Sequence, residues 1–299
     1  MKNILIITIA SDKANRSETL KTFTAALNTG PDVFDYAMIQ QVVFKIESGE
    51  LSVTLRGNEI HEKFHTIHLR NHDKYTDYAN ALRVYAQAHG IHLVNIADAQ
   101  LPYFGKLSQG ALLAVNGVPT PDLLTAFGNQ ELLQELATAD WQYPFVVKHN
   151  EGIRGVDNYL VTDSATLSKA LDNAKPGFIA QPFIPNSGEL RVLTFGDSLP
   201  PLVFQKTAVK GQYLNNTSQG GNAELVDEAE VPAQMMQDAR QAARLMGRDI
   251  AGVDVLLGLD GSHTILEVNS TPAIASGVYL GEKQDLYREY FHRLTGEKS

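Results

Sequence analysis

Two apolar segments, 251–257 and 265–269, are separated by a short polar stretch that contains Asp260 and Gly261. An Asp-Gly pair between apolar runs is typical of a β-hairpin whose two-residue loop forms a type I′ turn. The turn sets the register of such a hairpin, and a shift of one residue would turn every side chain of a strand to the other face. The sequence therefore predicts both a hairpin and the side chains that meet across it.

The predicted hairpin carries charged side chains in the middle of its apolar strands. Asp254 would lie directly opposite Glu267, and Asn269 would project from the same face because side chains alternate along a strand. Two opposed carboxylates, about 5 Å apart at Cβ, repel each other unless a positive charge lies between them. A Mg²⁺ ion held by these oxygen atoms would supply that charge. The alternatives are that a Lys or Arg side chain pairs with one carboxylate, or that a register slip turns it towards solvent.

Composition excludes several classes of function. The formal net charge of −9 argues against a nucleic-acid-binding surface, which normally carries a basic stripe. The chain has no cysteine, which excludes disulfides, thiolate metal sites and cysteine nucleophiles. The apolar run 4–9 is too short for a membrane span or a secretory signal, so we expect a buried strand there and a cytoplasmic protein.

The strand and helix patterns divide the 299 residues into three predicted units. Residues 1–102 alternate apolar strands with helices, which predicts an α/β domain with a partly parallel sheet. Residues 103–184 and 185–299 are predicted to form two further units of mixed helices and strands. Helices are predicted at 17–27, 76–89, 107–115, 131–138, 164–174 (with Ser164 as its cap) and 233–246. Strands are predicted at 4–9, 42–46, 51–55, 91–96, 145–148, 159–161, 178–183, 189–195 and 199–206, besides the final hairpin.

A possible phosphate site follows the strand 145–148. Neither a G-x-x-x-x-G-K-[ST] loop nor a G-x-G-x-x-G fingerprint is present. Lys148 ends this strand, and the next loop contains Gly152 and Gly155, whose backbone amides could close over phosphate oxygens. A lysine in this place is also compatible with a solvated strand end.

A second group of charges lies on the strands 189–195 and 199–206. Glu189 and Arg191 share one face of their strand because they are two residues apart. A cross-strand ion pair is the alternative to a functional role. With Gly196-Asp197 as a two-residue loop, Arg191 would pair with residue 202, away from Lys206. Spacing alone therefore does not show that the two cations converge.

Five segments, taken together, resemble a known family. They are FVVKHNEGIRG at 145–155, IAQPFI at 179–184, GELRVL at 188–193, AGVD at 251–254 and LEVN at 266–269. In this order they resemble the ATP-grasp fold, most closely the RimK-like carboxylate–amine ligases and glutathione synthetases, over residues 103–278. The resemblance implies a small N-terminal α/β domain (1–102), a central lid subdomain (103–184) and a C-terminal subdomain with the metal site (185–299). The two α+β subdomains would clasp ATP between them.

The resemblance also implies roles for single residues. Arg191 and Lys206 would face the transferring phosphoryl group, and Asp254, Glu267 and Asn269 would hold Mg²⁺, two ions in all, with Mn²⁺ as a substitute. The residues implied in ATP binding are Lys106, Lys148, Gly152, Gly155, Gln181, Pro182, Phe183, Glu189, Asn215 and Asn216. Pro182 replaces the acidic residue that relatives usually carry beside the adenine, and proline offers no N–H there. Leu214 replaces an arginine that is frequent in relatives, which bears on the substrate side.

The implied reaction is the ATP-dependent joining of a carboxylate to an amine through an acyl phosphate. The expected partner is an amino acid, a short peptide or a protein terminus, without nucleic acid or membrane; a homo-oligomer stays open. Arg70 is a candidate anchor for a substrate carboxylate, and Thr271 and Ser276 are candidates for the acceptor side. The alternatives are a ligase of the graspetide type, which modifies ribosomal peptides and could use the hairpin 42–55 for a leader, and an inactive nucleotide-binding protein.

Overall fold

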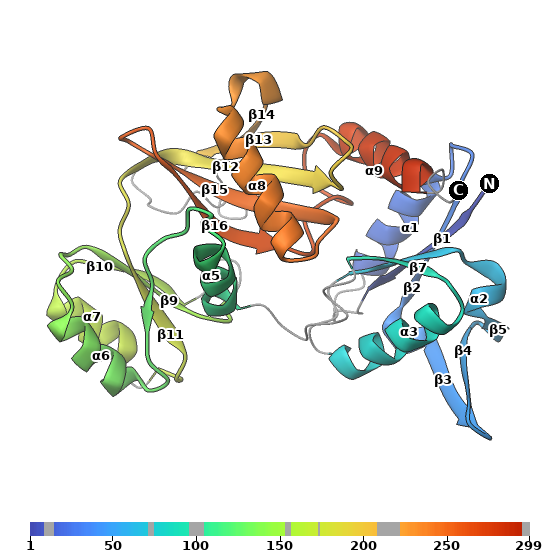
Figure 1. Ribbon diagram of the computed structural model, residues 1–299, viewed down its shortest axis with the longest axis horizontal. Coiled ribbons are helices and arrows are strands. Elements are labelled where there is room, and N and C mark those ends of the chain that lie inside the picture. Colours follow the sequence, from blue (N-terminus) through green and yellow to red (C-terminus); the bar gives the residue numbers. More distant parts are fainter. Residues whose placement is uncertain are drawn as a thin grey trace.

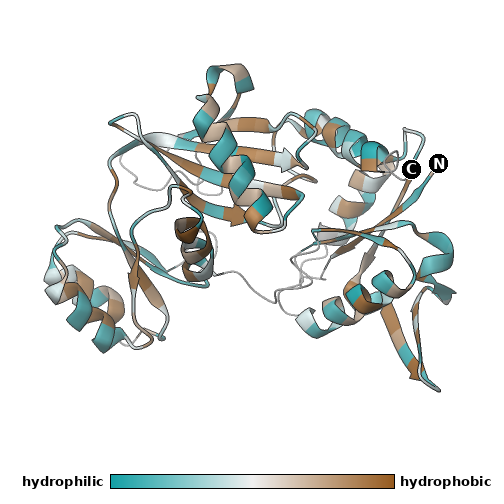
Figure 2. Cartoon of the chain, viewed as in Figure 1, coloured by the Kyte–Doolittle hydropathy of each residue, from teal (hydrophilic) through white to brown (hydrophobic). Residues whose placement is uncertain are grey.

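The computed structural model describes residues 1–8, 15–70, 75–95, 105–152, 157–172, 174–207 and 222–294 (Figure 1). Apolar residues concentrate in the strands of its sheets, while the outer faces of the helices are mixed or polar (Figure 2). None of the helices in the described ranges is long and apolar enough to span a bilayer.

The N-terminal part contains a parallel sheet of order β2-β1-β6-β7. Its strands are β1 (Asn3–Thr8), β2 (Val33–Met38), β6 (Thr66–Leu69) and β7 (His92–Val94). The helices α1 (Asn15–Leu27) and α3 (Thr76–Ala88) confirm two predicted helices. Ile4 and Leu5, adjacent in β1, are both fully buried, as expected of a parallel strand covered on both faces. The predicted α/β alternation is confirmed, although β2 was not predicted.

A small antiparallel sheet projects from this unit (Figure 1). It comprises β3 (Val42–Glu47), β4 (Glu50–Leu55) and β5 (Asn58–Glu59), with η1 (Ile39–Gln41) before it and α2 (Ile60–Lys63) after it. The predicted hairpin is confirmed, because Val42 pairs with Leu55 and Glu47 with Glu50.

The central part is a four-stranded sheet of order β10-β9-β11-β8 with two helices on one face (Figure 1). Its elements are β8 (Leu124–Thr125), α6 (Asn129–Thr138), β9 (Phe145–His149), β10 (Asn158–Val161), α7 (Ser164–Leu171) and β11 (Phe178–Pro182). Ser164 is not the cap of α7. Asp163 is, because its carboxylate accepts a 2.7 Å hydrogen bond from the backbone N–H of Thr166. The sheet and its helices form a core of their own between residues 124 and 180.

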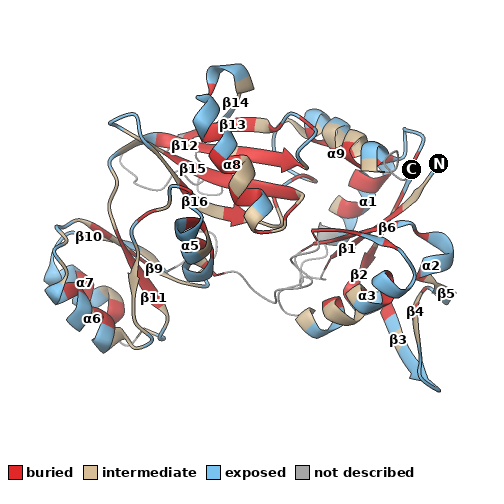
Figure 3. Cartoon of the chain, viewed as in Figure 1, coloured by how far each residue is buried: buried red, intermediate tan, exposed pale blue. Residues whose placement is uncertain are grey.

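The C-terminal part is an antiparallel sheet of order β14-β13-β12-β15-β16. Its strands are β12 (Asn186–Phe195), β13 (Leu202–Thr207), β14 (Asn222–Val226), β15 (Ile250–Gly258) and β16 (His263–Asn269). The helix α8 (Ala233–Leu245) covers one face after the short η4 (Glu228–Glu230). Buried residues concentrate in β12 and β15 of this sheet (Figure 3).

Two helices link the predicted units. Leu113 of α5 (Lys106–Val115) belongs to the core under α8, so α5 packs on the C-terminal sheet although it lies within 103–184. Tyr287 and Phe291 of α9 (Leu280–Leu294), which was not predicted, share a core with the N-terminal Phe23 and Phe34. The boundaries at 102/103 and 184/185 stay a prediction.

Asn95, directly after β7, joins the N-terminal sheet to the C-terminal one. It is fully buried and has φ +62°, a conformation that asparagine tolerates better than most residues. Its side-chain amide donates to the carbonyl of Ile250 (3.1 Å) and accepts from the N–H of Ile250 (2.9 Å), as a neighbouring strand would. The same Nδ2 lies 3.3 Å from the carbonyl oxygen of Ser270, and the N–H of Asn95 donates to Asp249 (2.9 Å). One side chain thus fixes the beginning of β15 and the end of β16.

Candidate active site

The candidate site lies on the face of the five-stranded sheet that α8 does not cover. Alternation along β12 sends Leu190 and Val192 into the core under α8. It therefore sends Glu189 and Arg191 to the opposite face. The charged residues of β12, β13, β15 and β16 on this opposite face are named the polar patch below; they are Glu189, Arg191, Lys206, Asp254 and Glu267, together with Asn269.

The final hairpin has the predicted facing pair but not the predicted turn. Asp254 lies opposite Glu267, as predicted. The loop, however, has three residues, 259–261, and only Gly261 among them has a positive φ (+82°), so it is not a type I′ turn. A β-bulge beyond Asp254 then shifts the register by one residue. The longer loop and the bulge cancel, which restores the predicted pair.

The bulge also explains why Glu267 reaches the polar patch. Ile265 and Val268 are both fully buried in the core under α8, although they are three residues apart. Regular alternation would put them on opposite faces. The extra residue lets both face the core, and Glu267 between them is turned away.

The prediction that Arg191 pairs with residue 202 was wrong. Arg191 lies opposite Phe204, and Glu189 lies opposite Lys206. The connection between β12 and β13 is longer than two residues because Pro200 and Pro201 precede β13, and proline has no N–H to donate to a ladder. The longer loop moves Lys206 two residues along the strand, from a position opposite residue 187 to one directly opposite Glu189.

Both cations of the polar patch converge on Asp254. The guanidinium of Arg191 donates to both carboxylate oxygens, through Nε to Oδ1 and through Nη2 to Oδ2 (2.7 Å). Lys206 Nζ donates to Asp254 Oδ1 (2.8 Å) and to Glu189 Oε1 (2.5 Å). The structure therefore shows the alternative in which Lys and Arg side chains pair with one of the facing carboxylates. The pair is buried, since Lys206 is 8% exposed and Asp254 is 7% exposed.

Opposing effects act on the two buried carboxyl groups. Although burial acts to raise it, the charges of Arg191 and Lys206 hold the pKa of Asp254 well below its usual range. Burial and the negative charge of Asp254 raise the pKa of Glu189 to about 8, against the opposing effect of Lys206. Lys206 therefore bridges two buried carboxyl groups whose pKa values are shifted in opposite directions.

The donor set of the polar patch suits a hard cation. Asp254 and Glu267 supply carboxylate oxygens, and the amide of Asn269 lies 3.1 Å from Asp254 Oδ2. Oxygen ligands of this kind are those that Mg²⁺ prefers. Within the described ranges, no three His, Cys, Asp or Glu side chains are grouped as a metal site, so the third protein ligand would have to be the Asn269 amide.

Two lysines approach the polar patch from the central part and from α5. The positive charges of Lys106 and Lys148 are both stabilised by the negative charge of Glu267. Lys106 Nζ donates to the carbonyl oxygens of Gly152 (2.6 Å) and Asn150 (3.3 Å). Burial lowers the pKa of Lys106, and burial with the nearby charge of Lys106 lowers the pKa of Lys148 to about 8.

The lowered pKa of Lys148 predicts a pH dependence of ATP binding. If the charged form binds phosphate, ATP affinity falls as pH rises through about 8, and the dissociation constant increases about tenfold between pH 7 and pH 9. Lys148→Arg should remove this slope, since arginine stays charged throughout. Titration calorimetry of both proteins over this range is the measurement, and equal slopes would contradict the prediction.

The lowered pKa of Lys148 also predicts how the free energy of unfolding changes with pH. An unfolded lysine keeps its proton up to about pH 10.4, so between pH 8 and that value the unfolded chain binds more protons than the folded one. The cost of burying charged Lys148 is therefore fully present below pH 8 and is relieved as pH rises.

The structure supports the other residues implied in ATP binding only in part. Gln181 is buried, and the N–H of Phe183, next to Pro182, donates to the carbonyl oxygen of Pro144 (3.0 Å). This donor could reach adenine only after breaking that bond. Gly152 is described, but Gly155, Asn215 and Asn216 lie outside the described residues, as does Leu214.

The substrate candidates surround the segment 270–277 that follows β16. Arg70 is 7% exposed and donates through Nη2 to the carbonyl oxygen of Pro272 (3.1 Å). Thr271 Oγ1 lies 3.5 Å from Ser270 Oγ. Lys283, which was not predicted from the sequence, donates to the carbonyl oxygens of Ala273 (2.9 Å) and Ser276 (3.1 Å) and so fixes this segment. The helical period of α9 could have shown that Lys283 faces inward.

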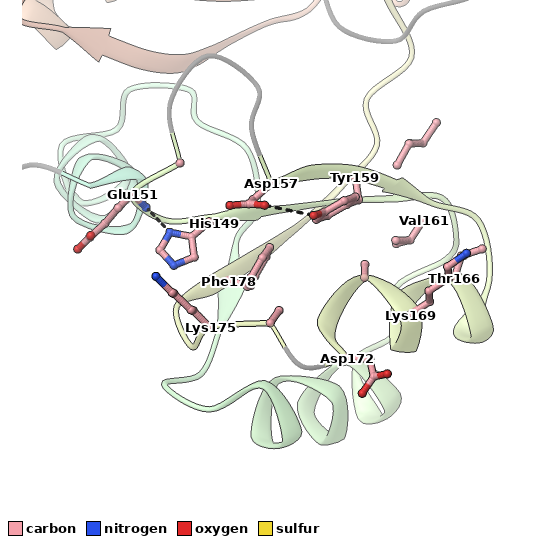
Figure 4. A pocket seen from close by; sticks show the side chains of 14 residues that line it. His149, Glu151, Asp157, Tyr159, Val161, Thr166, Lys169, Asp172, Lys175 and Phe178 are labelled. Atoms are coloured by element: carbon pink, nitrogen blue, oxygen red, sulfur yellow. Dashed lines mark hydrogen bonds between the residues drawn. The ribbon is translucent and has the colours of Figure 1, made fainter. Parts of the chain in front are cut away.

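A cavity of about 880 Å³ in the central part is separate from the polar patch (Figure 4). His149, Tyr159 and Phe178 line it, and of the predicted site residues in the described ranges only Gly152 does. His149 accepts from the N–H of Glu151 (3.2 Å) and contacts the carbonyl oxygen of Pro176 (3.1 Å), so both ring nitrogens are used locally. The charges that suit a nucleotide lie elsewhere, around Asp254.

Comparison with known proteins gives the family. A model of the RimK-like ATP-grasp domain matches residues 105–283. A protein of Xanthomonas euvesicatoria pv. vesicatoria (strain 85-10), named probable alpha-L-glutamate ligase, is 33% identical over 206 residues, which is 67% of each chain. Human beta-citrylglutamate synthase B is 26% identical over 245 residues, covering 79% of this chain and 62% of that protein.

Solved structures share the fold at low sequence identity. The ATP-grasp ligase PsnB complexed with a minimal precursor superimposes with a TM-score of 0.68 at 16% identity, covering 98% of this chain and 100% of PsnB. D-alanyl-alanine synthetase A from Vibrio cholerae O1 gives a TM-score of 0.66 at 14% identity, covering 98% of this chain and 97% of that chain. The predicted ATP-grasp fold is thus confirmed. Since the family model spans more than half of the sequence, this chain belongs to the RimK-like ATP-grasp family, a family of ADP-forming ligases that use ATP and Mg²⁺.

Proposed function

We propose that this chain joins a carboxylate to an amine on an amino acid, a short peptide or a protein terminus, at the expense of ATP. The observation that carries the proposal is the convergence of Arg191 and Lys206 on Asp254, opposite Glu267 and facing Lys106 and Lys148. Such a set of charges can neutralise a triphosphate from several directions. The two relatives named above, an alpha-L-glutamate ligase and a beta-citrylglutamate synthase, support glutamate as one substrate.

The reaction needs a better leaving group than oxide. An oxygen of the substrate carboxylate attacks the γ-phosphorus, ADP leaves, and the acyl phosphate forms. The amine then attacks the acyl carbon, phosphate leaves, and the nitrogen loses a proton. Arg191 and Lys206 would hold the transferring phosphoryl group, where fixed positive charges stabilise the transition state most.

The remaining roles follow from position. Lys106 and Lys148 would bind the phosphates from the central side, and Glu189 would bind the ribose hydroxyls. Asp254, Glu267 and Asn269 would hold Mg²⁺, as two ions or with Mn²⁺ in their place, and the metal neutralises phosphate charge. Arg70, Thr271 and Ser276 would line the substrate side. When nucleotide binds, the charged ends of Arg191 and Lys206 would turn from Asp254 to phosphate oxygens, because the structure shows them paired to that carboxylate.

The test is ADP release with Mg²⁺ and ATP in the presence of glutamate, other amino acids and short acidic peptides, with product masses measured. We expect ADP release that depends on an acid and an amine together, and a product with a new amide. Tight ATP binding without turnover on any pair would instead favour an inactive nucleotide-binding protein.

A peptide-modifying ligase of the graspetide type is the second candidate. The observation in its favour is the projecting β3–β4 hairpin, in which Val43 is 60% and Ile46 78% exposed, a surface that could meet a leader peptide. Turnover with free amino acids would argue against it, and an intramolecular loss of water from a precursor peptide would support it.

A further inference from the structure

Gly252 is the third residue of β15 and lies directly under the side chain of Arg191. A Cβ atom at this position would lie 3.1 Å from Arg191 Cδ, 3.3 Å from Arg191 Nη1 and 3.1 Å from Pro272 Cβ. Carbon atoms in favourable contact are about 3.5–4.0 Å apart, so a methyl group here would be compressed on two sides. The arginine stem occupies the space that any other residue would need.

The backbone gives no separate reason for glycine. Gly252 is not among the glycines with a positive φ, and it pairs regularly with Leu193 on one side and Asn269 on the other. Glycine within a strand lowers its stability and marks a close approach. Arg191, packed across the strand beside Pro272, is the group that approaches.

The missing side chain determines where the guanidinium lies. Arg191 comes from β12, and its stem crosses Gly252 while Nε and Nη2 reach the two oxygens of Asp254. Nη1 and Pro272 both contact the Cβ position of Gly252, so this end of the guanidinium lies near the segment 270–277. In this pose the guanidinium of Arg191 reaches from Asp254, a candidate metal ligand, to the neighbourhood of the segment 270–277, which holds the substrate candidates.

We propose that Gly252 is a positioning residue. Because it has no side chain, Arg191 can lie flat across β15, where the phosphoryl group would be transferred. The inference rests on the role proposed for Arg191. A methyl group at 252 would displace the arginine stem by a few tenths of an ångström. Because a misplacement of about 1 Å in a reacting group costs on the order of 100-fold in rate, this smaller displacement should cost about tenfold. Binding of the rest of ATP, which relies on other residues, would change little.

The experiment compares Gly252→Ala, Arg191→Ala and the double variant with the wild type. We expect Gly252→Ala to lower kcat by about tenfold while KM for ATP stays within about threefold. In the Arg191→Ala background, the added methyl should lower kcat by no more than about threefold, because residues that act through one another are not additive. The matched control is Gly281→Ala in α9, where an added Cβ meets nothing within 4 Å, and it should match the wild type.

Unfolding measurements separate this proposal from the proposed function. The same double-mutant cycle on the unfolding equilibrium needs no activity, and Gly252→Ala should destabilise the protein more with Arg191 present than without it. Equal effects in both backgrounds, or effects on kcat that multiply, would overturn the positioning role. If the wild type forms no product, the proposed function fails, and the unfolding cycle still decides whether Gly252 makes room for Arg191.

Discussion

Glu267→Gln is expected to lower kcat by on the order of 100- to 1,000-fold, with the thermal unfolding midpoint close to that of the wild type. Glu267 lies opposite Asp254, and its negative charge acts on Arg191, Lys106 and Lys148. Glutamine keeps the shape but removes the charge, so it weakens a Mg²⁺ ligand and the alignment of three cations together. The side chain is half-buried, which leaves the fold little affected.

The matched control is Glu135→Gln on the exposed face of α6, far from the charged residues. It makes the same chemical change and should leave kcat and the midpoint as they are. Full turnover in Glu267→Gln, measured as ADP release at saturating Mg²⁺, would be incompatible with a metal-binding role for this hairpin.

The largest effect on stability is expected from Lys206→Met. Lys206 donates to Asp254 and Glu189, and all three side chains are at most 12% exposed. Without Lys206, Arg191 alone would balance Asp254 and Glu189, and removing one partner of a buried ion pair typically costs about 3–5 kcal/mol. We therefore expect the free energy of unfolding, from denaturant titration at pH 7, to fall by about that amount, and turnover to be lost.

A second substitution tests the cause. Lys206→Met combined with Glu189→Gln removes one of the two carboxyl groups that Lys206 bridges, so part of the lost free energy should return. Arg191 still pairs with Asp254 in this double variant. If the double variant is as unstable as Lys206→Met alone, the ion network is not what stabilises this part of the sheet.

The sequence predicted the facing acidic pair because alternation and approximate register are local properties. It did not predict the turn, since the three-residue loop and the bulge beyond Asp254 offset each other. A bulge depends on which residues the core accepts, here Ile265 and Val268 under α8, and this is a tertiary constraint. The correct pair was thus reached from an incorrect loop.

The convergence of the cations could not be read from spacing. Counting back from Gly196-Asp197 gave a short loop, whereas the two prolines before β13 lengthen it and move Lys206 opposite Glu189. Gly252 did leave a signal, because an isolated glycine within an apolar strand indicates a close approach. Which side chain approaches is set by a neighbouring strand some sixty residues away in the sequence, as the pairing of Arg191 with Asp254 shows.

The amide of Asn95 has a mechanical consequence for how the site can open. The Asn95 side chain hydrogen-bonds to the backbone of Ile250 as a neighbouring strand would, and it also reaches the carbonyl oxygen of Ser270. The N-terminal sheet is therefore attached to both strands of the hairpin that carries Asp254 and Glu267. Those parts should rotate as one body. The segment 124–180 has a core of its own, so we expect it to move separately from them, carrying Lys148 towards or away from its counter-charges.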